Sequence, residues 1–546
     1  MTYRTLSSVL LAVLLSFGAV GCTDTGVSPE STATAENTFT DANSLRSFLA
    51  KLYAGLALTG QVGPAGAGDI QGIDDEGFSS YTRLWWQMQE LPTDEAVIAW
   101  SDVGVQELNT QGWSSDNPFN SGMYSRVFFQ AAQVNEFLRQ TTDAQLDAKG
   151  IRSGRRDDIA QWRAEARFLR ALSYWHAIDL FGAVPLVTED DPVGTGEGES
   201  APEMSTADSL FAFVESELRD ISDTEGDETL PPAGAAEYGR ADKGAAWMVL
   251  SKMFLNAEVY IGESRYDDAV AFSNRIIDAY GATEDALESD YHDLFLADNH
   301  TAKGIIFPVP QDGENSQNFG NTTFLVNAST GGSVTPDSFG VPGGGWLGLR
   351  ATPTLVDRFE SNDTRPVFEN MPGETQFFQQ GRTKELQTIT EFSQGYAVPK
   401  YQNMTSEGEM GQDDQFPDTD YPMFRLAEAY LTYAEAKLRG GAGGDIDPLN
   451  LVNLLRDRAG ADEVSSLSLD FILEERSREL FWEGTRRTDL RRFGLFTGGE
   501  FVWPFKGGSN NVTGGSTQDF LGLYPIPSSE ILANPNLTQD DQNPGY

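Results

Sequence analysis

The sequence of 546 residues contains a single cysteine and three histidines, and both shortages exclude chemistry. With one cysteine the chain has no internal disulfide, so covalent cross-links do not stabilise its fold. The histidines are His176, His292 and His300; they form no HExxH motif and have no Cys or His partner at ligand spacing. A zinc hydrolase is therefore disfavoured. His176 lies in a strongly helical pattern and is predicted to be structural.

Basic residues are also scarce. The chain has 82 Asp and Glu against 38 Lys and Arg, a net charge of −44, and only nine of the basic residues are lysines. Nucleic-acid binders neutralise phosphates with basic patches, so this composition excludes them. Hydrophobic residues still make up 39 % of the chain and aromatics 11 %, which is enough for a large folded core.

The acidity has two interpretations. The favoured one is adaptation to high salt, where screening removes most of the self-repulsion between carboxylates. The alternative is a specific cationic partner. Calcium in the acidic stretches 188–203 and 407–420 stays open, but neither has the Asp spacing of an EF-hand loop, and no metal site is predicted.

Long apolar runs are absent after the N-terminus. Residues 1–21 predict an export signal, because the apolar run 9–17 is too short to span a bilayer. It ends in Ala-Val-Gly-Cys22, which resembles a bacterial lipobox, where the cysteine thiol is acylated after cleavage. Cys22 is predicted to be a lipid anchor; an ordinary signal peptide with an incidental cysteine is the alternative. Residues 22–40 predict a flexible tether, so the protein is expected to be anchored to a membrane without crossing it.

From residue 41 onward the hydrophobic periodicity is mostly helical. Residues 157–181 carry apolar and small side chains at helical spacing, and the pattern stops at Gly182. The segment W-x2-L-S-x2-F (247–254) fits the first helix of a tetratricopeptide unit, and a second helix follows from Tyr266. Residues 422–460 predict another helix–loop–helix. Such units stack to bury a shared face, so the predicted fold class is mainly α with an irregular helical-repeat body.

Long stretches rich in Gly, Asn, Ser and Thr separate the helical blocks, and loops of such length are usually functional or disordered. They are 59–77, 189–203, 311–348, 369–393 and 498–522. No G-x-S-x-G occurs, and the G-x-G-x-x-G at 343–348 follows a Pro-rich turn instead of a strand, so a serine hydrolase or dinucleotide site is not indicated.

The loops do offer aromatic rings, which stack on the apolar faces of sugars. Candidates are Trp100 and Trp113 with Asp102 between them, and Trp346 beside Arg350.

Short motifs occur along nearly the whole chain behind the lipobox. They are LPTDEAVI (91–98), AEARFLRA (164–171), DLFGAVPL (179–186), RLAEAY (425–430), EERSREL (474–480), WEGTRRTDL (482–490), LYPIP (523–527), NPNL (534–537) and QNPGY (542–546). Read together, these segments resemble the SusD/RagB family of outer-membrane nutrient-binding lipoproteins and follow that family's order.

The resemblance implies a SusD-like fold in which four tetratricopeptide-like units support a loop-rich ligand-binding face. It implies an outer-membrane lipoprotein without catalytic activity or cofactor, which delivers oligosaccharides to a TonB-dependent transporter of the SusC type. Two regions of one compact body are expected, 41–310 and 311–546. Glycan contacts of the family map onto Asp94, Trp100, Asp102, Trp113, Trp346 and Arg350.

The arginine-rich run near the C-terminus is predicted to be structural. Its members are interleaved with Glu475, Glu479, Glu483 and Asp489 at helical spacings, which favours an ion-pair lattice over an anion site. They are Arg476, Arg478, Arg486, Arg487, Arg491 and Arg492.

Two alternatives remain open on the sequence. Peptide capture by a lipoprotein of the same transporter system would use the same fold. A secreted glycosidase would need a pair of catalytic carboxylates, and 82 candidates are too many to choose among. Within the glycan hypothesis, the acidic surface favours neutral sugars, because anionic sugars would be repelled at low salt.

Overall fold

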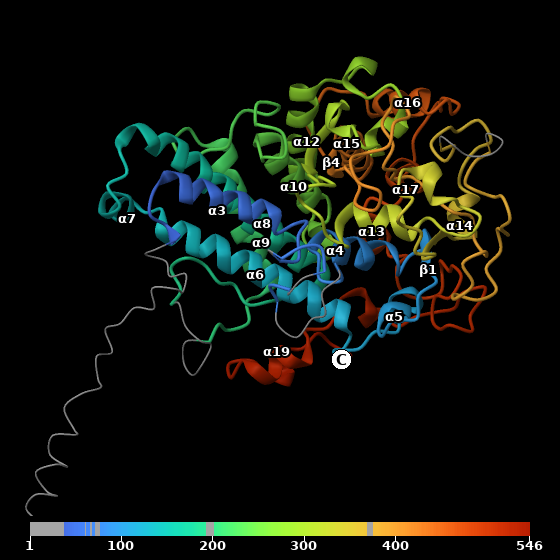
Figure 1. Cartoon of the computed structure of the whole chain (residues 1–546), viewed down its shortest axis with the longest axis horizontal. Helices are drawn as coiled ribbons and strands as arrows, with labels where there is room; N and C mark the ends of the chain where they lie inside the picture. The colour runs from blue at the N-terminus through green and yellow to red at the C-terminus, as the bar shows by residue number, and fades with distance from the viewer. Residues whose placement is uncertain (1–37, 61, 66–67, 71–76, 193–200, 369–374) are drawn as a thin grey trace, which may run out of the picture.

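The computed structural model describes residues 38–60, 62–65, 68–70, 77–192, 201–368 and 375–546. The predicted signal peptide, Cys22, most of the tether and parts of three predicted loops lie outside these ranges. Helices dominate, which confirms the mainly α prediction (Figure 1). The helices are α3 Ala42–Ala54, α4 Tyr81–Glu90, α5 Val105–Thr110, α6 Pro118–Gln140, α7 Asp143–Ala148, α8 Arg156–Phe181, α9 Ala207–Asp223, α10 Lys243–Leu255, α11 Ala257–Ile261, α12 Tyr266–Tyr280, α13 Asn321–Ala328, α14 Pro353–Val356, α15 Leu426–Leu438, α16 Pro448–Arg458, α17 Leu469–Leu480, α18 Arg486–Arg492 and α19 Ser528–Ala533.

Helix α8 is the central element of the N-terminal part. It ends where predicted, at Gly182, whose φ of 72° suits a residue without Cβ. From Phe168 to Phe181 every residue of α8 is buried, because α3, α6, α9 and α10 pack around it. His176 lies in this stretch, and its Nδ1 is 2.8 Å from the Tyr81 hydroxyl. Burial lowers the pKa of His176 to about 3, so the ring is neutral and, as predicted, structural.

The predicted helix–loop–helix units form a continuous stack. Helix α10 packs on α12, α12 on α15, and α15 on α16, and this stack occupies the top of the molecule in Figure 1. Burial of the shared faces, rather than helix propensity, holds such short helices in place. Because α12 precedes residue 310 and α15 follows it, the hydrophobic core is continuous across that position.

Two short antiparallel strand pairs connect distant parts of the chain. Strand β2 (Ile305–Val309) pairs with β4 (Tyr421–Arg425), with irregular register. Strand β1 (Ala96–Ile98) pairs with β3 (Leu349–Ala351), so that Ile98 lies opposite Leu349. The backbone N–H of Ala99 continues the ladder by donating to the Gly348 carbonyl over 2.9 Å. This second pair brings the residues after β1 beside those before β3.

One predicted loop contains a helix. Within 311–348, residues Asn321–Ala328 form α13, which is buried along its whole length and packs on α4. The eight residues of α13 are too few for hydrophobic periodicity to distinguish a helix from a buried loop. The G-x-G-x-x-G segment at 343–348 has no regular structure up to β3, as expected for a loop.

The six arginines of the C-terminal run all form ion pairs, and the predicted lattice is confirmed. Among the described residues, Arg478–Glu475 and Arg492–Asp489 pair along the helix at three residues' separation; the other partners lie on a neighbouring helix or in distant segments. Those pairs are Arg476–Asp489 at 2.7 Å, Arg486–Asp94 at 2.8 Å, Arg487–Asp179 at 2.8 Å, Arg491–Asp179 at 3.4 Å and Arg492–Glu435 at 2.6 Å.

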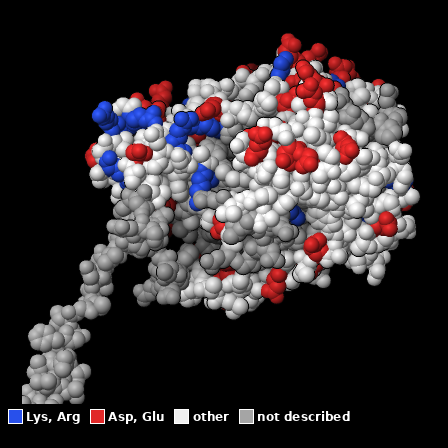
Figure 2. Space-filling model, viewed as in Figure 1, with Lys and Arg blue, Asp and Glu red and all other residues white. Residues whose placement is uncertain are grey.

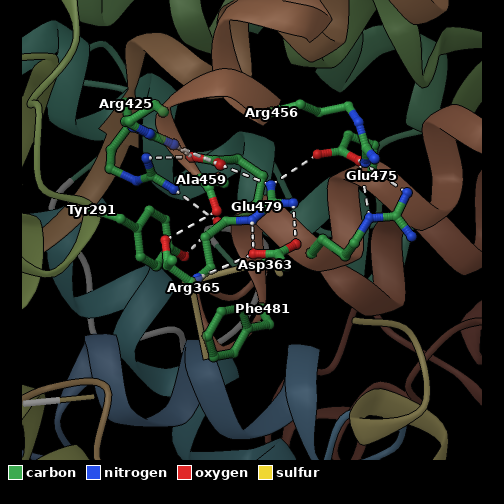
Figure 3. Close-up of polar contacts among 12 residues, drawn as sticks. Tyr291, Asp363, Arg365, Arg425, Arg456, Ala459, Glu475, Glu479 and Phe481 are labelled. Carbon is green, nitrogen blue, oxygen red and sulfur yellow. Dashed lines mark hydrogen bonds and ion pairs between the residues drawn. The ribbon is translucent and has the colours of Figure 1, made fainter. Parts of the chain in front are cut away.

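Glu479 lies at the centre of a second part of this lattice. Its carboxylate accepts from Arg365 at 3.2 Å, Arg425 at 3.0 Å and Arg458 at 2.6 Å, and Figure 3 shows it between Arg425 and Arg365. These arginines lower the pKa of Glu479 from 4.5 to about 2, although burial alone would raise it. The lattice therefore ties α17 to α16, β4 and the segment after α14.

Burial of the arginines leaves an acidic exterior. Among the described Lys and Arg residues only Arg46, Arg152, Arg155, Arg275 and Lys303 are exposed, while exposed Asp and Glu are far more numerous. On the face in Figure 2, acidic side chains are spread over the top and the right-hand part, and most visible basic ones lie at the left end near α3 and α7. The ratio of acidic to basic side chains is thus higher on the surface than in the sequence as a whole.

Adaptation of this surface to brine remains a prediction. We expect the melting temperature to rise by several degrees when NaCl increases from about 0.1 M to about 3 M, because the Debye length falls to roughly 3 Å at 1 M and repulsion between exposed carboxylates is screened. Calorimetry or circular dichroism measures the shift, and sorbitol at matched osmolality controls for osmotic stabilisation. An unchanged melting temperature would contradict the salt interpretation.

Candidate ligand-binding site

A pocket of about 500 Å³ opens where the segments joined by β1 and β3 meet α4 and α13. It is lined by Arg83, Trp100, Asp102, Phe319 and Trp346. Three of the six predicted contact residues, Trp100, Asp102 and Trp346, therefore lie together, although the two tryptophans are 246 positions apart in sequence.

The aromatic rings of the pocket are inclined to one another. Trp100 and Trp346 have ring centroids 6.3 Å apart at an interplanar angle of 47°, and Trp346 and Phe319 are 5.9 Å apart at 59°. The Trp100 Nε1–H donates to the Trp346 backbone carbonyl over 2.9 Å, which fixes the Trp100 ring relative to the backbone of residue 346. Coplanar rings would form a flat platform; these three turn through an angle from each ring to the next, and we call this arrangement an arc.

The backbone around Trp346 makes this arrangement possible. A Cβ at Gly348 would lie 2.9 Å from the Trp100 ring, so only glycine allows that ring to lie so close to the start of β3. Leu347 has a φ of 56°, a left-handed conformation that costs a non-glycine residue roughly 1–2 kcal/mol. On the other side, Gln106 donates its amide to the Trp100 carbonyl. Both tryptophan segments are therefore fixed before any ligand binds.

Arg83 is the main hydrogen-bond donor of the pocket. It comes from α4, and its side chain is mostly buried over the ring of Phe324, with 4.5 Å from Cζ to the ring centroid. Burial lowers its pKa to about 10, with the Asp102 carboxylate opposing the shift, so the guanidinium remains charged at neutral pH. Nη1 donates to the Phe319 carbonyl over 3.2 Å, and the buried Nε–H has no hydrogen-bond partner within the described ranges. Because this Nε–H is buried, the N–H groups of Nη1 and Nη2 that do not bond to Phe319 are the ones left to donate to ligand oxygens.

Arg83 and Phe319 were not predicted from the sequence. Arg83 lies in YTRLWW, which reads as an amphipathic helix, and Phe319 lies in an Asn/Gly-rich stretch with no distinguishing spacing. No local signal sets them apart from other buried residues.

Asp94 was predicted as a glycan contact, but the structure places it in the ion-pair lattice. Its side chain is fully buried and accepts from Arg486 Nε at 2.8 Å, Arg486 Nη2 at 3.0 Å and also from Arg358. These two arginines hold its pKa well below the usual range. Asp94 is therefore not presented to a ligand, and the LPTDEAVI segment connects β1 to the C-terminal helices.

Trp113 and Arg350 also lie in the interior, away from the residues that line the pocket. The Trp113 Nε1–H donates to the Tyr546 hydroxyl over 2.7 Å, and its ring packs 4.5 Å from that of Tyr524. Arg350 lies in β3 and donates only to backbone carbonyls, including that of Ile389 at 2.6 Å. Burial lowers its pKa to about 9. Both side chains stabilise the fold around the pocket and do not face its opening.

The five lining residues offer few groups for acid–base chemistry. Among the five, Asp102 is the single carboxylate, whereas glycoside hydrolysis ordinarily uses a pair. The residues described by the structure include no group of three or more His, Cys, Asp or Glu that could hold a metal ion. Within the same ranges, no helix has both the length and the apolar character needed to cross a bilayer.

Comparison with known proteins gives consistent similarities. A sequence model of the SusD family matches residues 367–546. The starch-binding protein SusD of Bacteroides thetaiotaomicron is 33 % identical over 594 aligned positions, covering 100 % of this chain and 99 % of that protein. SusD-like protein P2 of Formosa agariphila is 24 % identical, covering 98 % of each chain.

The same fold occurs in solved structures. Surface glycan-binding protein A of B. thetaiotaomicron, in complex with laminarihexaose, superposes with a TM-score of 0.67 at 19 % identity, covering 92 % of this chain and all of that one. The homologous protein of Bacteroides fluxus gives 0.69 at 21 % identity, with 93 % and 100 % covered. The chain matches the starch-binding protein along its full length at 33 % identity, it matches the family model, and it shares the fold of the solved structures. The chain therefore belongs to the SusD family.

Proposed function

We propose that this protein binds neutral oligosaccharides in the pocket formed by Trp100, Trp346 and Phe319, and that it holds them without cleaving them. The observation that carries the proposal is the inclined arc of three aromatic rings. The faces of such rings pack against the apolar faces of pyranose rings. Arg83 donates to ligand oxygens from within the pocket, and the exposed Asp102 accepts from hydroxyl groups.

The geometry favours glucans that curve along their length. Successive ring planes differ by 47° and 59°, so a straight, ribbon-like chain would contact one ring well and leave the others. The named relatives are consistent with this, since one is a starch-binding protein and another is in complex with laminarihexaose. Both glycans are glucans whose linkages produce a helical curvature.

The cellular role follows from the family and from the N-terminus. We propose a lipoprotein anchored through Cys22 to the outer membrane, exposed to the medium, which passes its glycan to a TonB-dependent transporter of the SusC type. The lipobox at 19–22 and membership of the SusD family support this role.

Calorimetry with three glucans tests the proposed function. Mature protein is titrated with maltoheptaose, laminarihexaose and cellohexaose, the last being the straight control. We expect at least one of the curved glucans to bind with a clear preference over cellohexaose, and prolonged incubation to release no new reducing ends. Failure of all three to bind, or the best binding by cellohexaose, would contradict the proposal. Release of reducing ends by purified protein would indicate an enzyme instead.

A further inference from the structure

A second concavity, which we call the α3 groove, lies on the other side of the segment 309–319. It has a volume of about 420 Å³, within the range of small-molecule sites. One wall is the face of α3 that carries Arg46, Leu49, Ala50 and Tyr53 at helical spacing, and the other is formed by residues 237–240 and 309–316. Its lining is largely aliphatic and aromatic.

Two tyrosine rings in the α3 groove are held in position by their hydroxyl groups. Tyr238 donates to the buried Asp420 over 2.6 Å, and Tyr53 donates to the buried Glu165 over 2.7 Å. Asp420 also accepts from the backbone N–H of Gln311 over 2.7 Å, so one carboxylate fixes residues on both loops of the far wall. With their hydroxyls bonded to the protein, these tyrosines have mainly their rings left to contact a ligand in the groove. Tyr238 is 46 % exposed, and its ring centroid lies 6.2 Å from that of His300 at an interplanar angle of 75°.

The charges around the groove are balanced. Arg46 of α3 lies 3.8 Å from Glu237 on the opposite wall, and both side chains are more than half exposed, so this pair spans the mouth of the groove and contributes little stability. Arg240 is paired with Glu165, with 2.9 Å from its Nε to the carboxylate. A rim with both signs offers donors and acceptors to hydroxyl groups without favouring an anion or a cation. This balance fits a neutral ligand with an apolar face and a polar edge, which is the chemistry of a pyranose ring.

The two concavities share one chain segment. Val309 and Ser316 line the α3 groove, and Phe319, three residues further, lines the pocket of Trp100 and Trp346. We propose that the α3 groove is a second glycan-binding site, which stacks a pyranose unit on Tyr238 and Tyr53. This inference rests on the proposed function, since it assigns the same class of ligand to a different set of side chains. Two sites on one protein would raise its avidity for polysaccharide far more than for short oligosaccharides.

Variants that separate the two sites test the inference. The double variant Trp100→Ala/Trp346→Ala removes the first site; in that background we expect weak residual binding of maltoheptaose or laminarihexaose by calorimetry. Adding Tyr238→Ala to this double variant should weaken the remaining glycan binding at least tenfold. Tyr238→Phe is the matched control: it loses the hydrogen bond to Asp420 but keeps the ring, so binding should persist. In the otherwise unchanged protein, Tyr238→Ala should reduce retention on gels containing amylopectin or laminarin several-fold and leave heptasaccharide or hexasaccharide affinity within about twofold.

The outcomes separate the two proposals. If the double tryptophan variant binds neither probe at millimolar concentration, or if adding Tyr238→Ala changes nothing, the second site is wrong while the first stands. If the unchanged protein binds neither probe, the proposed function fails and this inference fails with it. Melting temperatures of all variants verify folding; because Tyr238 is partly exposed, its truncation should be tolerated.

Discussion

Replacing Trp346 by alanine is expected to weaken glycan binding by about 30-fold or more, equivalent to roughly 2 kcal/mol or above. Trp346 is the middle ring of the arc, with Phe319 on one side and Trp100 on the other, so its removal breaks the continuous surface. Its backbone carbonyl, which accepts from Trp100, remains in the variant. The loss should therefore come from the missing ring and not from displacement of Trp100. Calorimetry with maltoheptaose and laminarihexaose measures it.

Trp346→Phe is the matched control for this experiment. It retains a smaller aromatic face and should recover most of the affinity that Trp346→Ala loses. Both variants should melt close to the unchanged protein, because Trp346 is only partly buried and packs at the edge of the core. Wild-type affinity in Trp346→Ala would show that glycans bind elsewhere. Unaltered binding of peptides by the same variant would favour peptide capture.

Neutralising Glu479 is expected to destabilise the protein by about 3–5 kcal/mol, which is typical when one partner of a buried ion-pair network is removed. The carboxylate is fully buried and accepts from three arginines. Arg365 and Arg425 keep other carboxylate partners in Glu479→Gln, but Arg458 loses the one carboxylate with which it pairs among the described residues, and the buried network gains an excess positive charge. Urea unfolding monitored by tryptophan fluorescence measures the change. Asp143→Asn is the control: Asp143 pairs with Arg156 at 2.8 Å but is 92 % exposed, and its loss should cost less than about 1 kcal/mol.

At low pH, the difference in free energy of unfolding between Glu479→Gln and the unchanged protein should disappear. The pKa of Glu479 is lowered from 4.5 to about 2, so the folded state binds this proton more weakly than the unfolded state. Its contribution is fully present above about pH 4.5 and is lost as the pH falls through about 2. Glu475 and Asp489, whose pKa values are also lowered to about 2 by neighbouring arginines, lose theirs in the same range. A constant stability difference from pH 7 to pH 2 would contradict this role for the Glu479 charge.

Local patterns in the sequence predicted the scaffold well. The apolar spacing of 157–181 and the stop at Gly182 correspond to α8, and the tetratricopeptide-like segment at 247–254 lies in α10. The interleaved charges of the C-terminal run indicated ion pairing for all six arginines. These features succeed because helical periodicity, helix ends and charge alternation are properties of neighbouring residues.

The residues that line the candidate pocket were predicted only in part. Trp100, Asp102 and Trp346 lie together in the pocket, but Asp94, Trp113 and Arg350 are interior, and Arg83 and Phe319 carried no signal. Asp94 shows why: its arginine partners are 264 and 392 positions away, so nothing in its own segment distinguishes a ligand contact from a buried ion pair.

The sequence by itself therefore determined the helical class, the family resemblance and the acidity of this protein. The tertiary structure decided which of its many aromatic and charged side chains line the candidate pocket, and which are paired inside. It also decided that nearly all arginines would be turned inward, leaving the acidic residues to form the surface. The physical reason is that exposure depends on packing between segments hundreds of residues apart. Here the pairing of β1 with β3, and the ion pairs that join the LPTDEAVI segment to α18, set that packing.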